Sequence, residues 1–296
     1  MTGGTGRFNA NEQIMNKFES VFKSAKDSLS VDAQGIKKAS GDCRDAARQT
    51  SATCDTINSH SRRLIDFAVE TQGALDELRG GGGGGVSHLA AVARAASGDD
   101  LRAALAAASD VDDLARVCVD RSVEMTRAID AGVATLPAVL RKAIDRGREQ
   151  ARENGGREAD GVTVNAPPDV GPDVRALEET VERVRNASAL TALEALQGAF
   201  HAISSEGERC RDMFHTVRDF SEDVMRVSTA IQEFKAGKVP GHAKSLAKDI
   251  WRCLRLSDLI RSFAVAAGKV IQWIVKVMQA IRNKAGSKFG RLLNGA

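Results

Sequence analysis

The chain has 296 residues, of which 43% are hydrophobic and 27% are charged, and its formal net charge is +3. This balance excludes a disordered chain, and the length allows one large or two medium domains. Aromatic residues make up only 4%, tyrosine is absent and proline is rare. Alanine and long straight side chains lose little entropy in a helix, so the composition favours long helices, and we find no alternating pattern that predicts strands.

Charge is distributed unevenly along the chain. Residues 241–296 carry 11 basic and 2 acidic side chains, a net charge of +9, whereas residues 1–240 carry a net charge of −6. The positive excess therefore coincides with the most apolar segment, a combination typical of helices that bind anionic surfaces. The alternative is a basic helix that packs against acidic neighbours within the protein.

The five cysteines are widely spaced, and no two form a C-x-x-C pair. Their odd number and spacing fit neither a zinc site nor a disulfide framework. Cys43 and Cys54 lie eleven residues apart, about three helical turns, which predicts two packed thiols on one helix face. Reduced cysteines and an N-terminal segment without an apolar signal region predict a cytoplasmic protein, associated with membranes at most peripherally.

In chain order, we expect residues 1–7 to be a loose N-terminus and residues 8–153 to form a first helical hairpin. A 4-3 spacing of small and apolar residues runs from Phe18 to Leu78, which predicts a coiled-coil-like seam on one long helix. Gly35 and Gly41 are candidate breaks in this helix. The glycine run Gly80–Gly85 predicts the turn of the hairpin.

The second arm of this hairpin contains two helix-start patterns. Ser97–Asp100 and Ser109–Asp112 both combine serine with acidic residues, which are favoured at helix N-termini. They predict a short helix at 99–108, followed by a longer helix at 110–153. Pro137 is expected to kink the longer helix.

The Gly/Pro-rich stretch 154–171 predicts a loop, and residues 172–285 predict a second helical hairpin. Its first arm runs from Pro172 to Phe234, and its seam includes a stutter. The stutter consists of two successive four-residue steps through Ala202, Glu206 and Cys210. The second arm is a helix at about 242–284, and residues 286–296 form a basic tail.

Together these elements predict an all-α fold, an elongated bundle of about four long helices arranged as two hairpins with coiled-coil-like seams. In outline the plan resembles helical pore-forming toxins, bilayer-remodelling helical proteins and coiled-coil scaffolds. No motif in the chain selects one of these classes.

The segment Leu254–Ile281 has 18 apolar residues among 28, and its one acidic residue is Asp258. A helix that is apolar over most of its circumference must be buried in a core, a partner or a lipid bilayer. Lys269 would cost about 3 kcal/mol at the centre of a bilayer, so a helix lying in the interface fits better than a spanning one. The candidate membrane- or partner-binding residues are Leu259, Phe263, Val270, Ile271, Trp273, Ile274, Val277 and Ile281, with the cations Lys269, Lys276, Lys284, Lys288 and Arg291.

The sequence contains no recognisable catalytic motif, and its five histidines form no pair at metal-ligand spacing. We therefore predict no catalytic residues, cofactor, metal ion or small-molecule substrate. The basic stripe Lys244, Lys248, Arg252 and Arg255 beside Trp251 raises nucleic acid as a ligand. The very apolar turns that follow disfavour it, because a nucleic-acid surface does not need them.

The sequence thus favours a non-enzymatic helical protein that associates with membranes through its apolar, cationic C-terminal helix and remodels or permeabilises them. The alternative is a soluble coiled-coil scaffold or protein-interaction module in which the same helix is the core. The expected partner is an anionic membrane surface or another protein, and self-association into a homo-oligomer stays open.

Overall fold

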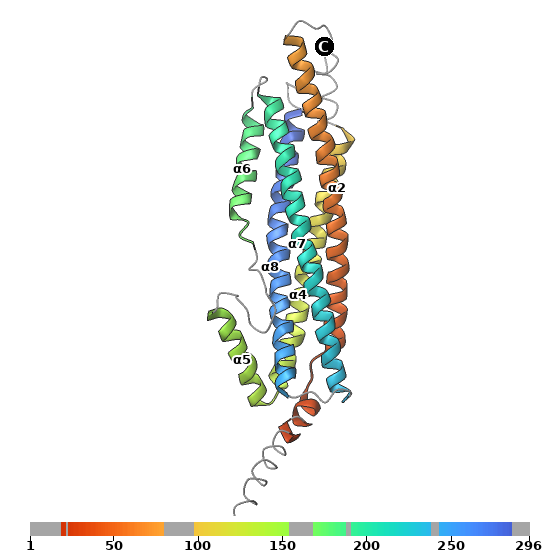
Figure 1. Ribbon diagram of the computed structural model, residues 1–296, viewed down its shortest axis with the longest axis vertical. Coiled ribbons are helices and arrows are strands. Elements are labelled where there is room, and N and C mark those ends of the chain that lie inside the picture. Colours follow the sequence, from red (N-terminus) through yellow and green to blue (C-terminus); the bar gives the residue numbers. More distant parts are fainter. Residues whose placement is uncertain are drawn as a thin grey trace, which may run out of the picture. The chain divides into compact units, whose positions relative to one another are not determined.

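A computed structural model describes residues 19–21, 23–79, 98–153, 168–187, 191–237 and 243–285. Over these residues the protein is helical and contains no strand, which confirms the all-α prediction (Figure 1). The main helices are α2 (Ala33–Arg79), α4 (Asp99–Thr135), α5 (Ala138–Glu153), α6 (Gly171–Asn186), α7 (Ala192–Lys235) and α8 (Ala243–Ala285). The expected N-terminus at 1–7, the turn Gly80–Gly85, the loop at 154–167 and the tail at 286–296 lie outside the described residues.

The long helix expected along this seam is interrupted at residues 29–32, before α2 begins. Asp32 caps α2, since its carboxylate accepts a hydrogen bond from the Gly35 N–H at 2.8 Å. Val31 is fully buried at the break, against Gly132 of α4. Neither Gly35 nor Gly41, the two candidate breaks, interrupts α2.

The buried face of α2 is made largely of small and hydroxyl-bearing side chains. Two of its buried hydroxyls hydrogen-bond within the helix: Ser40 donates to the Ile36 carbonyl at 2.9 Å, and Thr50 donates to the Ala46 carbonyl at 2.8 Å. This arrangement satisfies these two hydroxyls without a partner on another helix. Ala33, Ala39, Ala46, Ser51 and Asn58 are also buried. The buried positions that keep the predicted 4-3 spacing are Ile36, Ser40, Cys43, Ala47, Thr50, Cys54, Ile57, Ser61, Leu64, Ala68 and Thr71.

α4 differs from the prediction for the second arm at two points, Ser109–Asp112 and Pro137. It passes without interruption through Ser109–Asp112, so the separate helix at 99–108 was wrong. Asp112 lies within the helix and pairs with Arg116 at 2.5 Å, an i,i+4 contact that supports the helix where a start was expected. Pro137 ends α4 instead of kinking it, because proline offers no N–H for a continuing helix, and α5 begins as a separate helix.

The helix predicted from Pro172 to Phe234 is likewise two helices, α6 and α7. Ala187 follows α6 in an extended conformation, with φ −58° and ψ 130°, so the chain leaves the helix there. The predicted stutter does not match the burial, because Ile203 and Gly207 are buried, whereas Ala202 and Glu206 are only partly so. The buried 4-3 series of α7 is Leu196, Phe200, Ile203, Gly207, Cys210, Phe214, Val217, Ser221, Val224, Ser228 and Ile231.

The chain divides into two compact units, and α2, α4, α7 and α8 each contribute residues to both. The first unit comprises Met1–Arg44, Val119–Pro167 and Asp219–Arg261. Within it, α5 packs on α8 where Gly147 meets Trp251, and it pairs with α4 through Arg148 and Asp130 at 2.5 Å. Gly147 has no side chain to displace the indole, since a Cβ there would lie 3.0 Å from the ring.

The second unit comprises Asp45–Cys118, Pro168–Arg218 and Ser262–Ala296. In it, α4 approaches α8 closely where Gly268 faces Ala115. α7 contacts α8 where the Cys210 thiol lies 3.8 Å from the Ala267 carbonyl oxygen. α6 lies along α7 (Figure 1). The predicted division of the sequence into two successive hairpins stays a prediction.

Candidate functional site

The apolar face of α8 lies in the protein interior. Val270, Ile271, Ile274, Val277 and Ile281 have no exposed surface. Phe263 is also buried, whereas Leu259 and Trp273 are half-buried. The side chains predicted to meet a membrane or a partner are therefore packed against the protein's own helices.

By length and composition alone, one stretch in the described part of the chain, Leu246–Lys284 within α8, is apolar enough to cross a membrane. Its most apolar part is 61% buried inside the protein. The core helix of a soluble protein meets the same criterion, and in the folded form the apolar face of this stretch is packed inside the protein.

The opposite face of α8 is exposed and cationic in the second unit. Lys269, Lys276 and Arg282 point to solvent, together with Gln272 and Gln279. From Ser262 to Ala285 the sequence contains no acidic residue. We call these five residues the cationic strip of α8, and it carries two of the cations that the sequence singled out.

Trp273 is a second feature of this surface. The Lys276 ammonium lies over its indole ring, 3.7 Å from the ring centroid. This cation–π contact holds a positive charge beside a half-buried aromatic ring. Such a pair combines an apolar body with a polar tip, as interfacial aromatic side chains do.

A shallow groove of about 530 Å³ separates the cationic strip from α4. Asp112 faces it and pairs with Arg116 of its own helix, and its other oxygen lies 3.5 Å from the Gln272 amide nitrogen. One carboxylate thus borders the strip, and it already has a basic partner. The residues that line the groove are Leu105, Ser109, Asp112, Gln272, Val275, Lys276, Gln279 and Arg282.

Lys284 differs from the other predicted cations because it binds backbone atoms of another helix. Its ammonium donates to the Arg185 carbonyl at 3.2 Å and to the Ala187 carbonyl. These oxygens belong to the C-terminal end of α6, where a cation is favoured by the helix dipole. Lys288 and Arg291 lie outside the described residues.

The other end of α6 is held by a partly buried group of charges. Asp173 of α6 forms an ion pair with Arg209 of α7. Burial raises the pKa of Glu206 above its ordinary value of 4.5; nearby Asp173 raises it further, and Arg209 lowers it. Asp173 Oδ2 and Glu206 Oε2 are buried without a hydrogen-bond partner, so this group is only partly satisfied.

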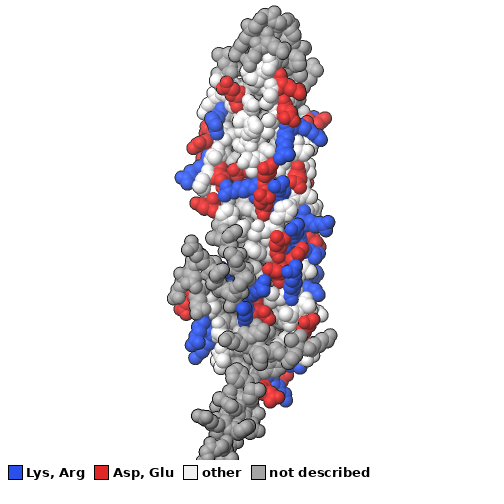
Figure 2. Space-filling view, in the orientation of Figure 1, with Lys and Arg blue, Asp and Glu red and all other residues white. Residues whose placement is uncertain are grey.

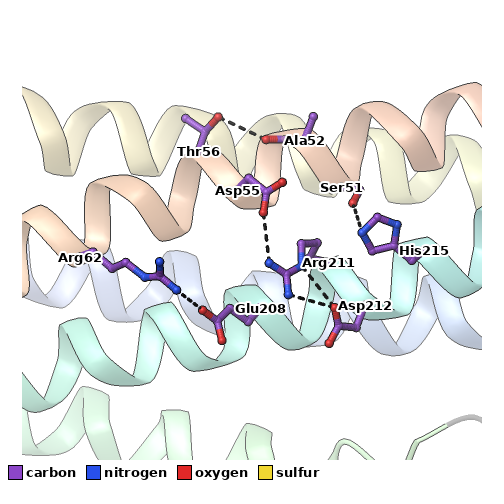
Figure 3. A network of polar contacts seen from close by, with 9 residues as sticks. All are labelled: Ser51, Ala52, Asp55, Thr56, Arg62, Glu208, Arg211, Asp212 and His215. Atoms are coloured by element: carbon purple, nitrogen blue, oxygen red, sulfur yellow. Dashed lines mark hydrogen bonds and ion pairs between the residues drawn. The ribbon is translucent and has the colours of Figure 1, made fainter.

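A polar network joins α2 to α7 along the rim of their contact in the second unit (Figure 3). Arg62 pairs with Glu208 at 2.6 Å. Asp55 lies 3.4 Å from Arg211, which also contacts its neighbour Asp212. These contacts fix the two helices in antiparallel register, because the residue number rises on one helix as it falls on the other.

The network contains one pair that resembles a nucleophile and its base. The Ser51 hydroxyl lies 3.1 Å from His215 Nε2. Ser51 is buried, so the two residues form a polar pair at the contact between α2 and α7. Across the described chain, no group of three or more His, Cys, Asp or Glu side chains is placed to hold a metal ion.

All five cysteines are free and buried, which confirms the prediction of packed thiols. Burial raises the pKa of Cys54 and of Cys253 to about 12, and it also raises that of Cys210. A thiol with so high a pKa is almost wholly protonated at neutral pH and therefore a poor nucleophile.

Two residues of the basic stripe of α8, both in the first unit, make internal contacts. Arg252 lies 3.3 Å from Asp223 of α7, and Arg255 lies over the ring of Trp251, 5.5 Å from its centroid. Trp251 is itself buried. On the face that Figure 2 shows, basic and acidic side chains are interspersed, with no broad patch of one sign.

Fold and site together define an all-α protein whose most apolar helix is a core element with one exposed cationic face. The chain matches no protein-family model, no curated protein and no solved structure at the significance applied.

Proposed function

We propose that this is a non-enzymatic, cytoplasmic helical protein that associates with anionic membranes through α8. The observation that carries the proposal is the cationic strip: Lys269, Lys276 and Arg282 lie exposed on a helix whose other face is wholly apolar. Each basic side chain near an anionic surface contributes about 1 kcal/mol of attraction. The strip is accessible in the folded protein, so docking requires no unfolding.

Remodelling or permeabilisation of the bilayer forms a second stage of the proposal. The apolar side chains of α8, such as Ile274, are fully buried, so they reach lipid only after α8 leaves its neighbours. Released, the helix has the composition of an interfacial amphipathic helix, with Trp273 and Phe263 in its apolar zone.

For the architecture we propose an elongated bundle of four long helices with coiled-coil-like seams. Support comes from the lengths of α2, α4, α7 and α8, which are 47, 37, 44 and 43 residues. The buried 4-3 spacing along α2 and α7 is the spacing of coiled-coil seams.

A second candidate function is a soluble scaffold that binds protein partners and uses α8 solely as its core. The complete burial of the apolar face of α8 favours it. The two candidates differ in two respects that can be tested: whether the protein binds anionic vesicles, and whether α8 separates from α4 when it permeabilises them.

A disulfide between α4 and α8 makes this test. The Cβ of Ala115 lies 4.0 Å from the position of a Cβ on Gly268, within the usual Cβ–Cβ separation of about 3.5–4.5 Å for disulfides. We expect the oxidised double variant A115C/G268C to bind vesicles of phosphatidylcholine and phosphatidylserine without releasing an entrapped dye. After reduction, the same protein should bind them and release the dye.

The single variants A115C and G268C, treated with the same oxidant, control for the substitutions and for the native thiols. Raising the salt concentration should weaken docking, because the Debye length falls from about 10 Å at 0.1 M to about 3 Å at 1 M. Equal dye release from the oxidised and reduced double variant would refute release of α8. If neither anionic nor neutral vesicles bind the unmodified protein, the scaffold is the remaining candidate.

A further inference from the structure

The stability of α6 depends strongly on its contacts with neighbouring helices. It has 16 residues, and its buried side chains are Leu177, Thr180, Val181 and Val184. Isolated helices shorter than about 12–15 residues are marginal in water, and helices in proteins draw most of their stability from tertiary packing, so α6, only slightly longer, depends on its contacts. Its N-cap residue, Val170, makes no side-chain capping bond, which leaves the first turn to other partners.

Charged side chains from two other helices fasten the ends of α6. Arg209 of α7 pairs with Asp173 in its first turn. Lys284 of α8 donates to the carbonyls of Arg185 and Ala187 at its C-terminus. The α8 contact matters most for regulation, because Lys284 belongs to the helix that carries the cationic strip.

Between these two ends, the C-terminal half of α6 is not sealed against α7. A groove of about 430 Å³ opens there, lined by Thr180 and Arg183 of α6 and by Glu194 and Gly198 of α7, among others. Val181 and Val184 of this half are buried, so apolar packing holds one face of the helix beside the groove. Beyond Val184, the bonds from Lys284 hold the last turn.

We propose that α6 is a clamp fastened to α8 by Lys284, and that anionic lipid headgroups release it by competing for that ammonium. This inference rests on the proposed membrane function and adds its regulation. In the closed form Lys284 donates hydrogen bonds to the carbonyls of α6. In the lipid-bound form it donates them to headgroup phosphates and carboxylates.

The direction of the competition follows from the strength of the bonds. The charged ammonium strengthens both kinds of bond, but only a charged oxygen adds direct Coulomb attraction as well. The carbonyls at the end of α6 carry only partial charge. Coupling of this kind is reciprocal, so loosening α6 must in turn raise the affinity of α8 for anionic lipid.

Hydrogen–deuterium exchange of the α6 amides tests the clamp. In buffer, Lys284→Met should speed their exchange roughly three- to tenfold, the effect of losing about one hydrogen bond's net stabilisation. Lys276→Met is the matched control: it removes the same charge from α8, but Lys276 contacts Trp273 of its own helix. It should leave α6 exchange in buffer unchanged.

Vesicles of phosphatidylcholine and phosphatidylserine in equal parts, added to saturation, should speed α6 exchange in the unmodified protein. Vesicles of phosphatidylcholine alone should not. K284M should show no further acceleration on anionic vesicles, whereas K276M should respond as the unmodified protein does once it is saturated.

If anionic vesicles bind but α6 exchange stays unchanged at saturation, the clamp is refuted and the membrane function stands. If no vesicle binds, both the membrane function and its regulation fail. If K284M and K276M exchange alike in buffer, Lys284 does not fasten α6, and the clamp is refuted whatever the lipid result.

Discussion

Ile274 offers a direct measure of how much of the stability resides in α8. Its side chain is fully buried within the apolar face of the helix. Ile274→Ala removes three carbon atoms, worth about 2.4 kcal/mol at about 0.8 kcal/mol for each buried methylene. The cavity left behind adds to this cost, so the total should lie within the range of about 2–5 kcal/mol found for such truncations.

The assay is urea unfolding followed by far-UV circular dichroism. With a slope of about 2–3 kcal/mol per molar urea, a loss of about 3 kcal/mol lowers the midpoint by about 1 M. The milder Ile274→Val should cost about 0.5–1.5 kcal/mol. Val265→Ala is the matched control on the same helix, because Val265 is 39% exposed and its truncation removes little buried surface.

A midpoint for I274A within experimental error of that for V265A would refute the assignment of α8 as a core helix. Ile274→Asp extends the series, because an unpaired buried charge costs more than a cavity. We expect I274D to unfold the second unit instead of yielding a soluble, folded protein that has merely lost membrane binding.

Three further predictions concern single groups. Because folding raises the pKa of Glu206, the folded protein binds a proton on this carboxyl more tightly than the unfolded chain does. Protonation of Glu206 should therefore increase stability as the pH falls from neutrality towards 4.5. Glu206→Gln should raise the urea midpoint at neutral pH and flatten this pH dependence. An unchanged pH dependence in E206Q would contradict this. Cys54 and Cys253, whose pKa is about 12, should resist a thiol reagent at neutral pH in the native protein and react once urea unfolds it; rapid native reaction would show that they are accessible. Gly132→Ala should destabilise the first unit, since its Cβ would lie 2.7 Å from the Cα of Val31. Gly41→Ala should stabilise α2 by up to about 1 kcal/mol, because no atom lies within 4 Å of the added Cβ. Calorimetry of both variants should show these opposite changes in stability.

The sequence by itself determined the helical fold class, the buried face of α2 and the bounds of α8. These features follow from local composition and from a spacing that repeats along the chain, so they need no knowledge of distant residues. Cys43 and Cys54 were placed correctly for this reason, because a shared helix face depends only on their separation. The sequence likewise identified the apolar face of α8, which is buried in every position from Val270 to Ile281 that it singled out, apart from the half-buried Trp273.

Tertiary structure decided where the helices break and which partner each exposed charge meets. Asp112 stands in a pattern typical of a helix start, yet it lies inside a continuous helix, where it pairs with Arg116 and lies near Gln272 of α8. The contacts of Lys284 and Glu206 depend on α6, which the sequence pattern predicted as one long helix together with α7. Pairings between residues about 100 positions apart leave no local signature, because a helix of given periodicity can pack against any complementary face; only the folded arrangement selects one.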